Sequence, residues 1–168
     1  MDLVLETERL NLRQFELQDA EFIISLLNSP GWLKYIGDRN VKTTEEAELY
    51  LLNGPMNSFK VNGFGLAMVE LKDSNVPIGM CGLIRRDYLQ LPDIGFALLS
   101  EYMGMSYGFE IAKATLDYAL HELKLPGILA ITLPDNVQSI KLIERIGMSF
   151  VKNIIVPDDN EELMLFST

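Results

Sequence analysis

A long amphipathic run that directly follows a set of strand-like segments constrains this fold more than any other feature of the sequence. From Ser106 to Leu123 the apolar side chains recur at helical spacing, and Pro126 and Gly127 mark where the helix must stop. Three apolar runs of β-strand character precede it, separated only by short turn segments: Gly63–Leu71, Ile78–Arg86 and Asp93–Leu99. Because short connections join antiparallel neighbours, the sequence predicts a three-stranded meander covered by one central helix.

The rest of the chain supplies further helices and strands around this centre. On the N-terminal side we predict a strand over Glu8–Phe15 and helices over Ala20–Asn28, Pro30–Gly37 and Thr43–Leu52, the last opened by a capping box of Thr43 and Glu46. On the C-terminal side we predict a strand over Gly127–Leu133, a helix over Asp135–Ile146 with Asp135 and Gln138 as its capping box, and strands over Phe150–Ile155 and Glu161–Phe166. No linker or repeat divides residues 1–168, so a single α/β domain with a mostly antiparallel seven-stranded sheet is expected.

Charge and cysteine content exclude several classes of function. With 14 basic and 24 acidic residues the net charge is -10, which repels nucleic acid and favours cationic partners such as amines. One cysteine, Cys81, and one histidine, His121, give neither a disulfide nor a zinc site, so no metal is expected. The sequence shows no signal peptide and no apolar run of membrane-spanning length, so we expect a cytoplasmic protein without membrane contact.

The segment from Ser100 to Gly108 joins the last strand of the meander to the central helix. It contains small residues, Gly104, Ser106 and Gly108, and no basic side chain. A helix N-terminus presents unpaired N–H groups and a partial positive charge, so main-chain donors alone can bind a phosphate here. A tight turn with nothing bound requires the same residues, and both interpretations stay open on this segment alone.

Three segments together resemble the GNAT acetyltransferases, and most closely the RimJ/RimL-type N-acetyltransferases. They are Asp93–Leu99, the turn that follows it, and Leu133–Met148, and the opening Glu6–Arg13 is also similar to that branch. The resemblance implies acetyl-CoA as the donor and a sheet that is splayed after the strand Asp93–Leu99. It also implies that the pantetheine arm bonds to this strand in the opening.

The resemblance also assigns the residues that bind the coenzyme. Phe96, Ala97 and Leu98 line the pantetheine and acetyl group through main-chain groups, although their side chains would equally suit a core. The pyrophosphate turn consists of Met103, Gly104, Met105, Ser106, Tyr107 and Gly108, where the family usually has Gln, Arg or Trp at position 103 and Gly at position 106. Asn136 bonds the pantetheine and Ser139 lies near the thiol, but Asn136 is also a candidate helix cap.

Direct acetyl transfer needs a deprotonated amine, a donor for the oxyanion and an acid for the thiolate. Asp93 matches an acidic position of the branch and is our candidate base, while a turn-capping role after Pro92 is the structural alternative. We expect a backbone N–H near Leu98 to meet the oxyanion. The tyrosine acid of many GNAT enzymes is replaced by Ile143, so Ser139 or a bound water is expected to protonate the thiolate.

Other chemistry-bearing side chains have a structural interpretation beside the functional one. Trp32 and Tyr35 belong either to the core or to the acceptor pocket, over which the resemblance places this helical segment. We expect His121 to be exposed, because it lies off the apolar stripe of the central helix, and Cys81 to be a small buried side chain.

The expected function is therefore acetyl transfer to a primary amine by a monomer or homodimer. The branch favours the N-terminal α-amine of a protein, as on ribosomal proteins, whereas the acidic surface would also suit a polyamine or aminoglycoside. The changes at positions 103, 106 and 143 also permit a protein that binds acyl-CoA as a sensor without catalysis.

Overall fold

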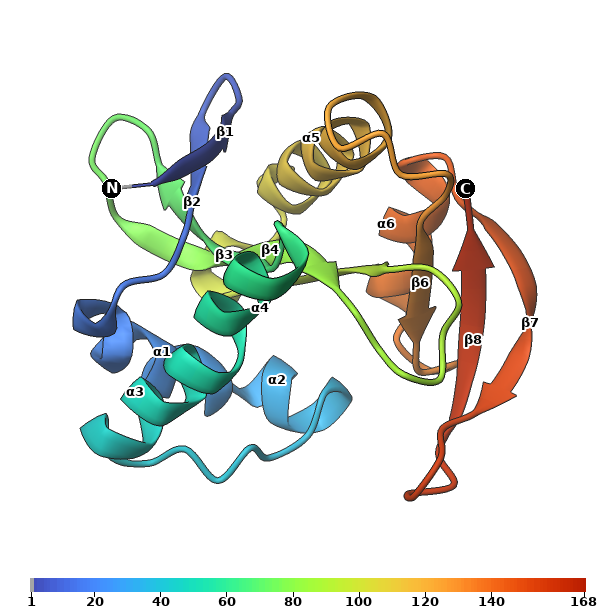
Figure 1. Cartoon of the computed structure of the whole chain (residues 1–168), viewed down its shortest axis with the longest axis horizontal. Helices are drawn as coiled ribbons and strands as arrows, with labels where there is room; N and C mark the ends of the chain where they lie inside the picture. The colour runs from blue at the N-terminus through green and yellow to red at the C-terminus, as the bar shows by residue number, and fades with distance from the viewer. Residues whose placement is uncertain (1) are drawn as a thin grey trace.

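The computed structural model describes residues 2–168, which form an eight-stranded sheet with helices on both faces (Figure 1). The strands lie in the order β1-β2-β3-β4-β5-β6-β8-β7, and all neighbours are antiparallel except β5 and β6. Their bounds are Leu3–Glu6 (β1), Leu10–Arg13 (β2), Leu66–Leu71 (β3), Pro77–Ile84 (β4), Asp93–Leu98 (β5), Leu129–Thr132 (β6), Ser149–Ile155 (β7) and Glu162–Ser167 (β8). The predicted α/β class and the β3–β4–β5 meander are confirmed.

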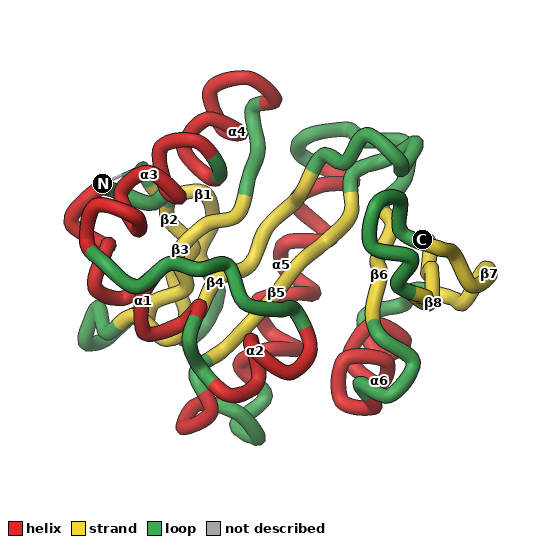
Figure 2. The backbone as a smooth tube through the Cα atoms, turned by 90° about the horizontal axis from the view of Figure 1, so that it is seen from below, coloured by secondary structure: helices red, strands yellow, loops and turns green. Residues whose placement is uncertain are grey.

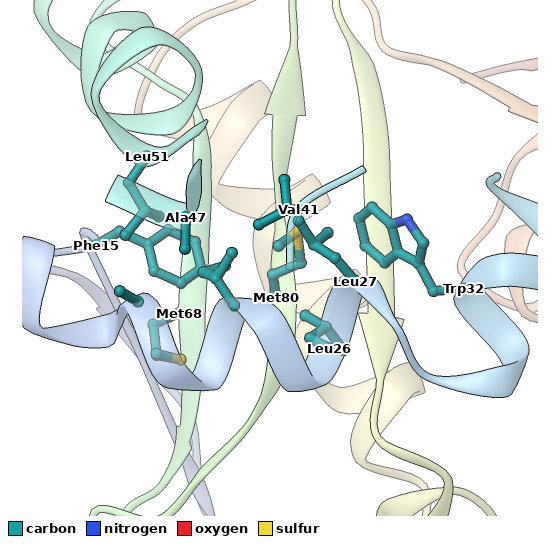
Figure 3. Close-up of a cluster of buried hydrophobic side chains, with 11 residues drawn as sticks. Phe15, Leu26, Leu27, Trp32, Val41, Ala47, Leu51, Met68 and Met80 are labelled. Carbon is teal, nitrogen blue, oxygen red and sulfur yellow. The ribbon is translucent and has the colours of Figure 1, made fainter. Parts of the chain in front are cut away.

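Two groups of helices cover the two faces of the sheet. The first group is α1 (Ala20–Leu27), α2 (Pro30–Tyr35), α3 (Thr44–Asn53) and α4 (Pro55–Asn62), and the second is α5 (Tyr107–His121) and α6 (Val137–Arg145). Side chains alternate along each strand, so Met68 and Met80 join the cluster around α1 to α3, shown in Figure 3, while Val69 and Cys81 pack with Ile111 of α5.

The sheet opens between β5 and β6, which diverge as Figure 2 shows. These two parallel strands pair only where Asp93 faces Leu129, and beyond that point they share no bridge. The Leu99 N–H donates to Ile78 O at 2.9 Å, so in this antiparallel register Ala97 also pairs with Met80 of β4. By the same alternation, the main-chain groups of Phe96 and Leu98 point into the opening.

The N-terminal segment that resembles the RimJ/RimL branch is tied to the start of α5. The Glu110 carboxylate accepts hydrogen bonds from Thr7 Oγ1 at 2.6 Å, from Arg9 N–H at 2.8 Å and from Arg9 Nε at 2.7 Å. The Arg9 guanidinium also lies over the Tyr107 ring at 4.4 Å. These contacts fix the first turn of α5 relative to β2, and thereby relative to the sheet.

The structure corrects three details of the sequence prediction. The sheet has eight strands rather than seven, because residues 3–6 form β1 beside β2, and helix α4 was not predicted. The Thr43–Glu46 capping box is confirmed. The box of Asp135 and Gln138 is wrong: Asp135 lies in the preceding turn, and Asn136 caps α6 by accepting from the Ser139 N–H at 3.2 Å.

Candidate active site

A cleft of about 970 Å³ occupies the opening between β5 and β6, a volume typical of sites for small ligands. One part of it, the helix end, is formed by the start of α5, the C-terminal half of β5 and one face of α6. The other part, the loop end, is formed by the loop between β4 and β5 and the β7–β8 hairpin, while α2 borders both parts, because an added Cβ at Gly31 would lie 3.8 Å from the Met103 side chain. The lining on this side includes Trp32, Tyr35, Arg39, Tyr50, Arg86, Tyr88, Asp93, Asp159 and Glu161.

The helix end contains the uncapped N-terminus of α5. Gly104 and Ser106 adopt left-handed backbone angles (φ 78° and 63°), and the Ser106 side chain makes no capping bond. The first-turn N–H groups of α5 therefore have neither a helical acceptor nor a side-chain cap, unlike those of α3 with its capping box. This is the arrangement expected of a site that uses main-chain donors for an anion.

The six residues of the predicted pyrophosphate turn differ in what they contribute. Met103, Gly104, Ser106 and Gly108 line the cleft. The side chains of Met105 and Tyr107 point elsewhere: Met105 is exposed, and Tyr107 packs beneath Arg9. Only the main chain of those two residues is available to a ligand.

Strand β5 offers main-chain groups to the cleft at alternate residues. Phe96 and Leu98 present a free N–H and C=O, whereas Ala97 uses both groups in its pairing with Met80. Ala97 also lines the cleft, but its main-chain groups are used within the sheet, so Phe96 and Leu98 are the residues with main-chain groups available to a ligand. The Ala97 methyl group packs against the cluster that contains Trp32.

Asn136 and Ser139 lie together at the start of α6 and line the cleft. The Asn136 Oδ1 atom caps the helix. The predicted contact with a ligand would therefore use a different atom of the same side chain. Its Nδ2 group remains available as a donor. Ile143, one turn further along α6, is 1% exposed and belongs to the hydrophobic core.

Asp93 begins β5 and is 1% exposed, with its Oδ1 atom 2.8 Å from the Nε atom of Arg86. Burial raises the pKa of Asp93 above its usual value, while the Arg86 charge and hydrogen bond oppose this shift. A buried carboxyl group with a raised pKa and a cationic neighbour inside a ligand cleft is a candidate general base.

At the loop end, Trp32 and Tyr35 both line the cleft, so the structure brings together the two predicted acceptor residues. Trp32 also belongs to the core: it is 6% exposed and lies at the margin of the buried cluster in Figure 3, and its Nε1 atom has no hydrogen-bond partner among the described residues. Core and pocket roles thus coexist in this residue.

Sequence reasoning missed most charged residues of the loop end, notably Arg39, Arg86, Asp159 and Glu161. Only Arg86 had a usable signal, because a β4–β5 hairpin in which Ile84 faces Asp93 places Arg86 near that carboxylate. The others come from loops with no local pattern.

A second, smaller hollow adjoins the loop end. It has a volume of about 460 Å³ and lies between the β4–β5 loop and the β7–β8 hairpin. Arg86 and Tyr88 line both it and the main cleft, so the loop end continues outward as a groove. Its other lining residues are Arg85, Asp87, Pro157 and Asp158.

The remaining reactive side chains lie outside the cleft lining. His121 is exposed near the C-terminus of α5. Cys81 is fully buried beside Thr115, and burial raises the pKa of its thiol to about 12. Within residues 2–168 no group of histidine, cysteine or carboxylate side chains has metal-binding geometry, and no helix there is long and apolar enough to cross a membrane.

Comparison with known proteins gives one consistent result. Residues 9–149 match the family model described as an acetyltransferase (GNAT) domain. The chain is 29% identical over 160 residues to an uncharacterised N-acetyltransferase, YnaD, of Bacillus subtilis (strain 168), and the alignment covers 94% of this chain and 90% of that protein.

Two similar solved structures are named for different amines. One is the ribosomal-protein-S5-alanine acetyltransferase of Vibrio fischeri, with a TM-score of 0.80, 22% identity, and coverage of 98% of this chain and 94% of that one. The other is the spermidine N-acetyltransferase of Vibrio cholerae in complex with CoA and spermine, with a TM-score of 0.76, 20% identity and coverage of 95% of both chains.

Proposed function

The chain belongs to the GNAT acetyltransferase family and is an N-acetyltransferase, and from that premise we propose that its acceptor is the N-terminal α-amine of a protein or peptide. The groove at the loop end carries this choice. It extends beyond the cleft between two loops, so an acceptor longer than its first residue has a surface to lie on.

The charges of the loop end support the same acceptor. Arg39 and Arg86 lie among the lining residues together with Asp93, Asp159 and Glu161, so the wall carries both signs. Arg39, which is not paired with Asp93, places a positive charge in the path of a polyamine with several positive charges. A peptide N-terminus carries one positive charge followed by neutral amides and suits a wall of mixed sign.

The donor in this family is acetyl-CoA, whose thioester supplies the acetyl group. The helix end fits it: the α5 N-terminus would hold the pyrophosphate, with Met103, Gly104, Ser106 and Gly108 allowing close approach. The free main-chain groups of Phe96 and Leu98 would bind the pantetheine arm as an added strand, and Asn136 Nδ2 would contribute a donor from α6.

The position of Asp93 favours Phe96 over Leu98 as the donor to the oxyanion. At about 3.3 Å per residue, Leu98 lies roughly 16 Å along β5 from Asp93, whereas Phe96 lies roughly 10 Å away. The base must reach the amine nitrogen that attacks the acetyl carbon, and the oxyanion donor must reach the oxygen on that carbon. The N–H group nearer to Asp93 is therefore the better placed. We therefore assign Phe96 to the acetyl group and Leu98 to the pantetheine.

Proton transfer completes the assignment. Asp93 takes the proton from the ammonium, directly or through a water molecule, and Arg86 holds the carboxylate in place. The buried Ile143 has no proton to give to the departing thiolate. Ser139, which lines the cleft, or a water molecule supplies that proton.

A free-thiol release assay with acetyl-CoA tests the acceptor across three panels: peptides of varied N-terminal residue, polyamines and aminoglycosides. We expect the highest kcat/KM with a peptide, and acetylation at its α-amine by mass spectrometry. A preference for polyamines would instead identify a small cationic amine as the acceptor. Asp159 and Glu161 would then attract its positive charges. Calorimetric binding of acetyl-CoA without turnover on any amine would identify a sensor.

Asp93→Asn tests the base. We expect kcat/KM for the amine to fall about a hundredfold or more, since general bases contribute roughly 10²–10⁴-fold. Acetyl-CoA affinity, measured by calorimetry, should stay unchanged. Normal activity of the variant across pH 6 to about 9 would assign the proton to another group or to water.

A further inference from the structure

The protein has to bind a polyanion although it is itself strongly acidic. Its net charge is -10, and coenzyme A carries about four negative charges at neutral pH from its phosphates. The α5 N-terminus supplies only about half a positive charge, and the pyrophosphate turn contains no basic side chain. A cationic side chain from elsewhere in the fold would therefore add an attraction that the main-chain donors of the helix end do not supply.

Three arginines line the cleft, and two of them are unsuited to this task. Arg86 is paired with Asp93 at 2.8 Å. Arg39 belongs to the segment between α2 and α3, at the loop end. The third, Arg145, lies in the last turn of α6, and among the described residues it has no carboxylate partner.

Contacts between α5 and α6 place Arg145 next to the phosphate-binding turn. The Arg145 guanidinium carbon lies 4.0 Å from the centre of the Phe109 ring, in the first turn of α5. Three residues earlier on α6, Leu142 lies against Gly108, where its Cδ2 atom would be 3.4 Å from an added Cβ. Adjacent turns of α6 thus flank adjacent residues of the α5 N-terminus.

With its central carbon over the Phe109 ring, the guanidinium can still present N–H donors to an anion. Contact with an aromatic face uses the plane of the group, whereas its N–H donors lie along the edge. An arginine held in this way is oriented but unsatisfied. Phosphate accepts two parallel N–H bonds from such an edge, in a geometry that lysine does not reproduce.

We propose that Arg145 binds a phosphate group of coenzyme A, and so supplies from α6 the positive charge that the turn at Met103–Gly108 lacks. This inference rests on the proposed use of acetyl-CoA as the donor. Two sources share the phosphate chemistry, the pyrophosphate and the 3′-phosphate, and ligands that lack one or the other distinguish them.

Calorimetric titration of the intact protein with coenzyme A tests the proposal. Arg145→Gln should weaken binding about tenfold, as expected for a lost hydrogen bond to a charged group, and Arg145→Lys should recover only part of the loss. The matched control is Lys141→Gln, which removes the same charge from an exposed position of α6 outside the cleft lining. It should leave the Kd within about twofold, because long-range charge effects are screened by salt.

Related ligands identify the phosphate. Equal affinity of wild type and Arg145→Gln for 3′-dephospho-CoA would assign the contact to the 3′-phosphate. If wild type binds 3′-dephospho-CoA more tightly than Arg145→Gln does, but both bind pantetheine equally in a competition assay, the contact is with the pyrophosphate.

Two results would overturn the proposal: a Kd of Arg145→Gln equal to that of Lys141→Gln, or a deficit that pantetheine shares in full, which would indicate a packing role through Phe109. Failure of the wild-type protein to bind coenzyme A would instead overturn the donor assignment itself.

Discussion

The two ends of the cleft are built from different parts of the polypeptide. The helix end depends mainly on main-chain groups, namely the first turn of α5 and the free N–H and C=O groups of Phe96 and Leu98, with Arg145 as its one proposed charged side chain. The loop end depends on side chains from α2, the β4–β5 loop, the start of β5 and the β7–β8 hairpin. A main-chain site can persist while its side chains change, whereas a side-chain site changes with every substitution. In the proposed function, the donor is therefore recognised mainly by features of the fold, and the acceptor by side chains of this particular chain.

This difference explains the unusual residues of the phosphate turn. Met103 and Ser106 depart from the family pattern, yet Ser106 adopts the left-handed conformation that the turn requires (φ 63°). Neither change removes a main-chain donor. The helix end therefore keeps its main-chain geometry with altered side chains.

The largest expected effect comes from filling the helix end. Gly108→Val should lower kcat/KM for acetyl-CoA about a hundredfold, because a displacement of the order of 1 Å at a reacting site has that cost. Gly108→Ala is the control, since its Cβ would meet only Leu142 at 3.4 Å and Leu98 at 3.8 Å. Initial-rate kinetics at varied acetyl-CoA measure both variants, and an unchanged KM in Gly108→Val would remove the turn from the site.

A smaller effect, about tenfold at low pH, should follow from Arg86→Met. Arg86 holds the pKa of Asp93 below the value that burial alone would give. Its removal raises that pKa further, so the ionised base is lost at a higher pH and the acidic limb of kcat/KM should move up by at least about one unit.

The pH profile of the double variant checks this assignment. In an Asp93→Asn background, Arg86→Met should produce no such movement, because the titrating group is absent. A shift that survives in the double variant would show that Arg86 acts on another group.

The smallest effect should come from one wall of the loop end. Tyr35→Ala should raise KM for the amine about threefold to tenfold, the range for one aromatic contact, with acetyl-CoA affinity unchanged. Leu33→Ala is its control, because Leu33 lies on the same short helix, is 41% exposed and does not line the cleft. Equal changes in acetyl-CoA affinity and amine KM would contradict the division of the cleft into two ends.

The helix end could be predicted from the sequence because its signals are local. The central helix, the strand before it and the small residues of the turn follow one another along the chain, and the Thr43–Glu46 box is likewise contained in four consecutive residues. The loop end could not be predicted in the same way. Its charged residues approach one another only after β5 and β8 have taken their places in the sheet.

Two missed elements have physical explanations of their own. Helix α4 buries little beyond Pro55, so it lacks an apolar stripe, although Pro55 at its start and the left-handed Gly63 at its end were usable signals. Strand β1 is short and has no fully buried residue. Its sequence therefore lacks the alternation of apolar and polar side chains that marks a strand with one buried face.

The opening between β5 and β6 has a consequence for the abundance of the protein in a cell. Beyond Asp93 the two strands leave unpaired edges within the sheet, and such edges are templates for association with other chains. A ligand that pairs with one of these edges prevents other chains from pairing with it. The same ligand also stabilises the folded state, by a free energy that rises with the logarithm of its concentration. The amount of protein that escapes aggregation and proteolysis should therefore follow the supply of the acetyl donor, so that the enzyme persists where its substrate is plentiful.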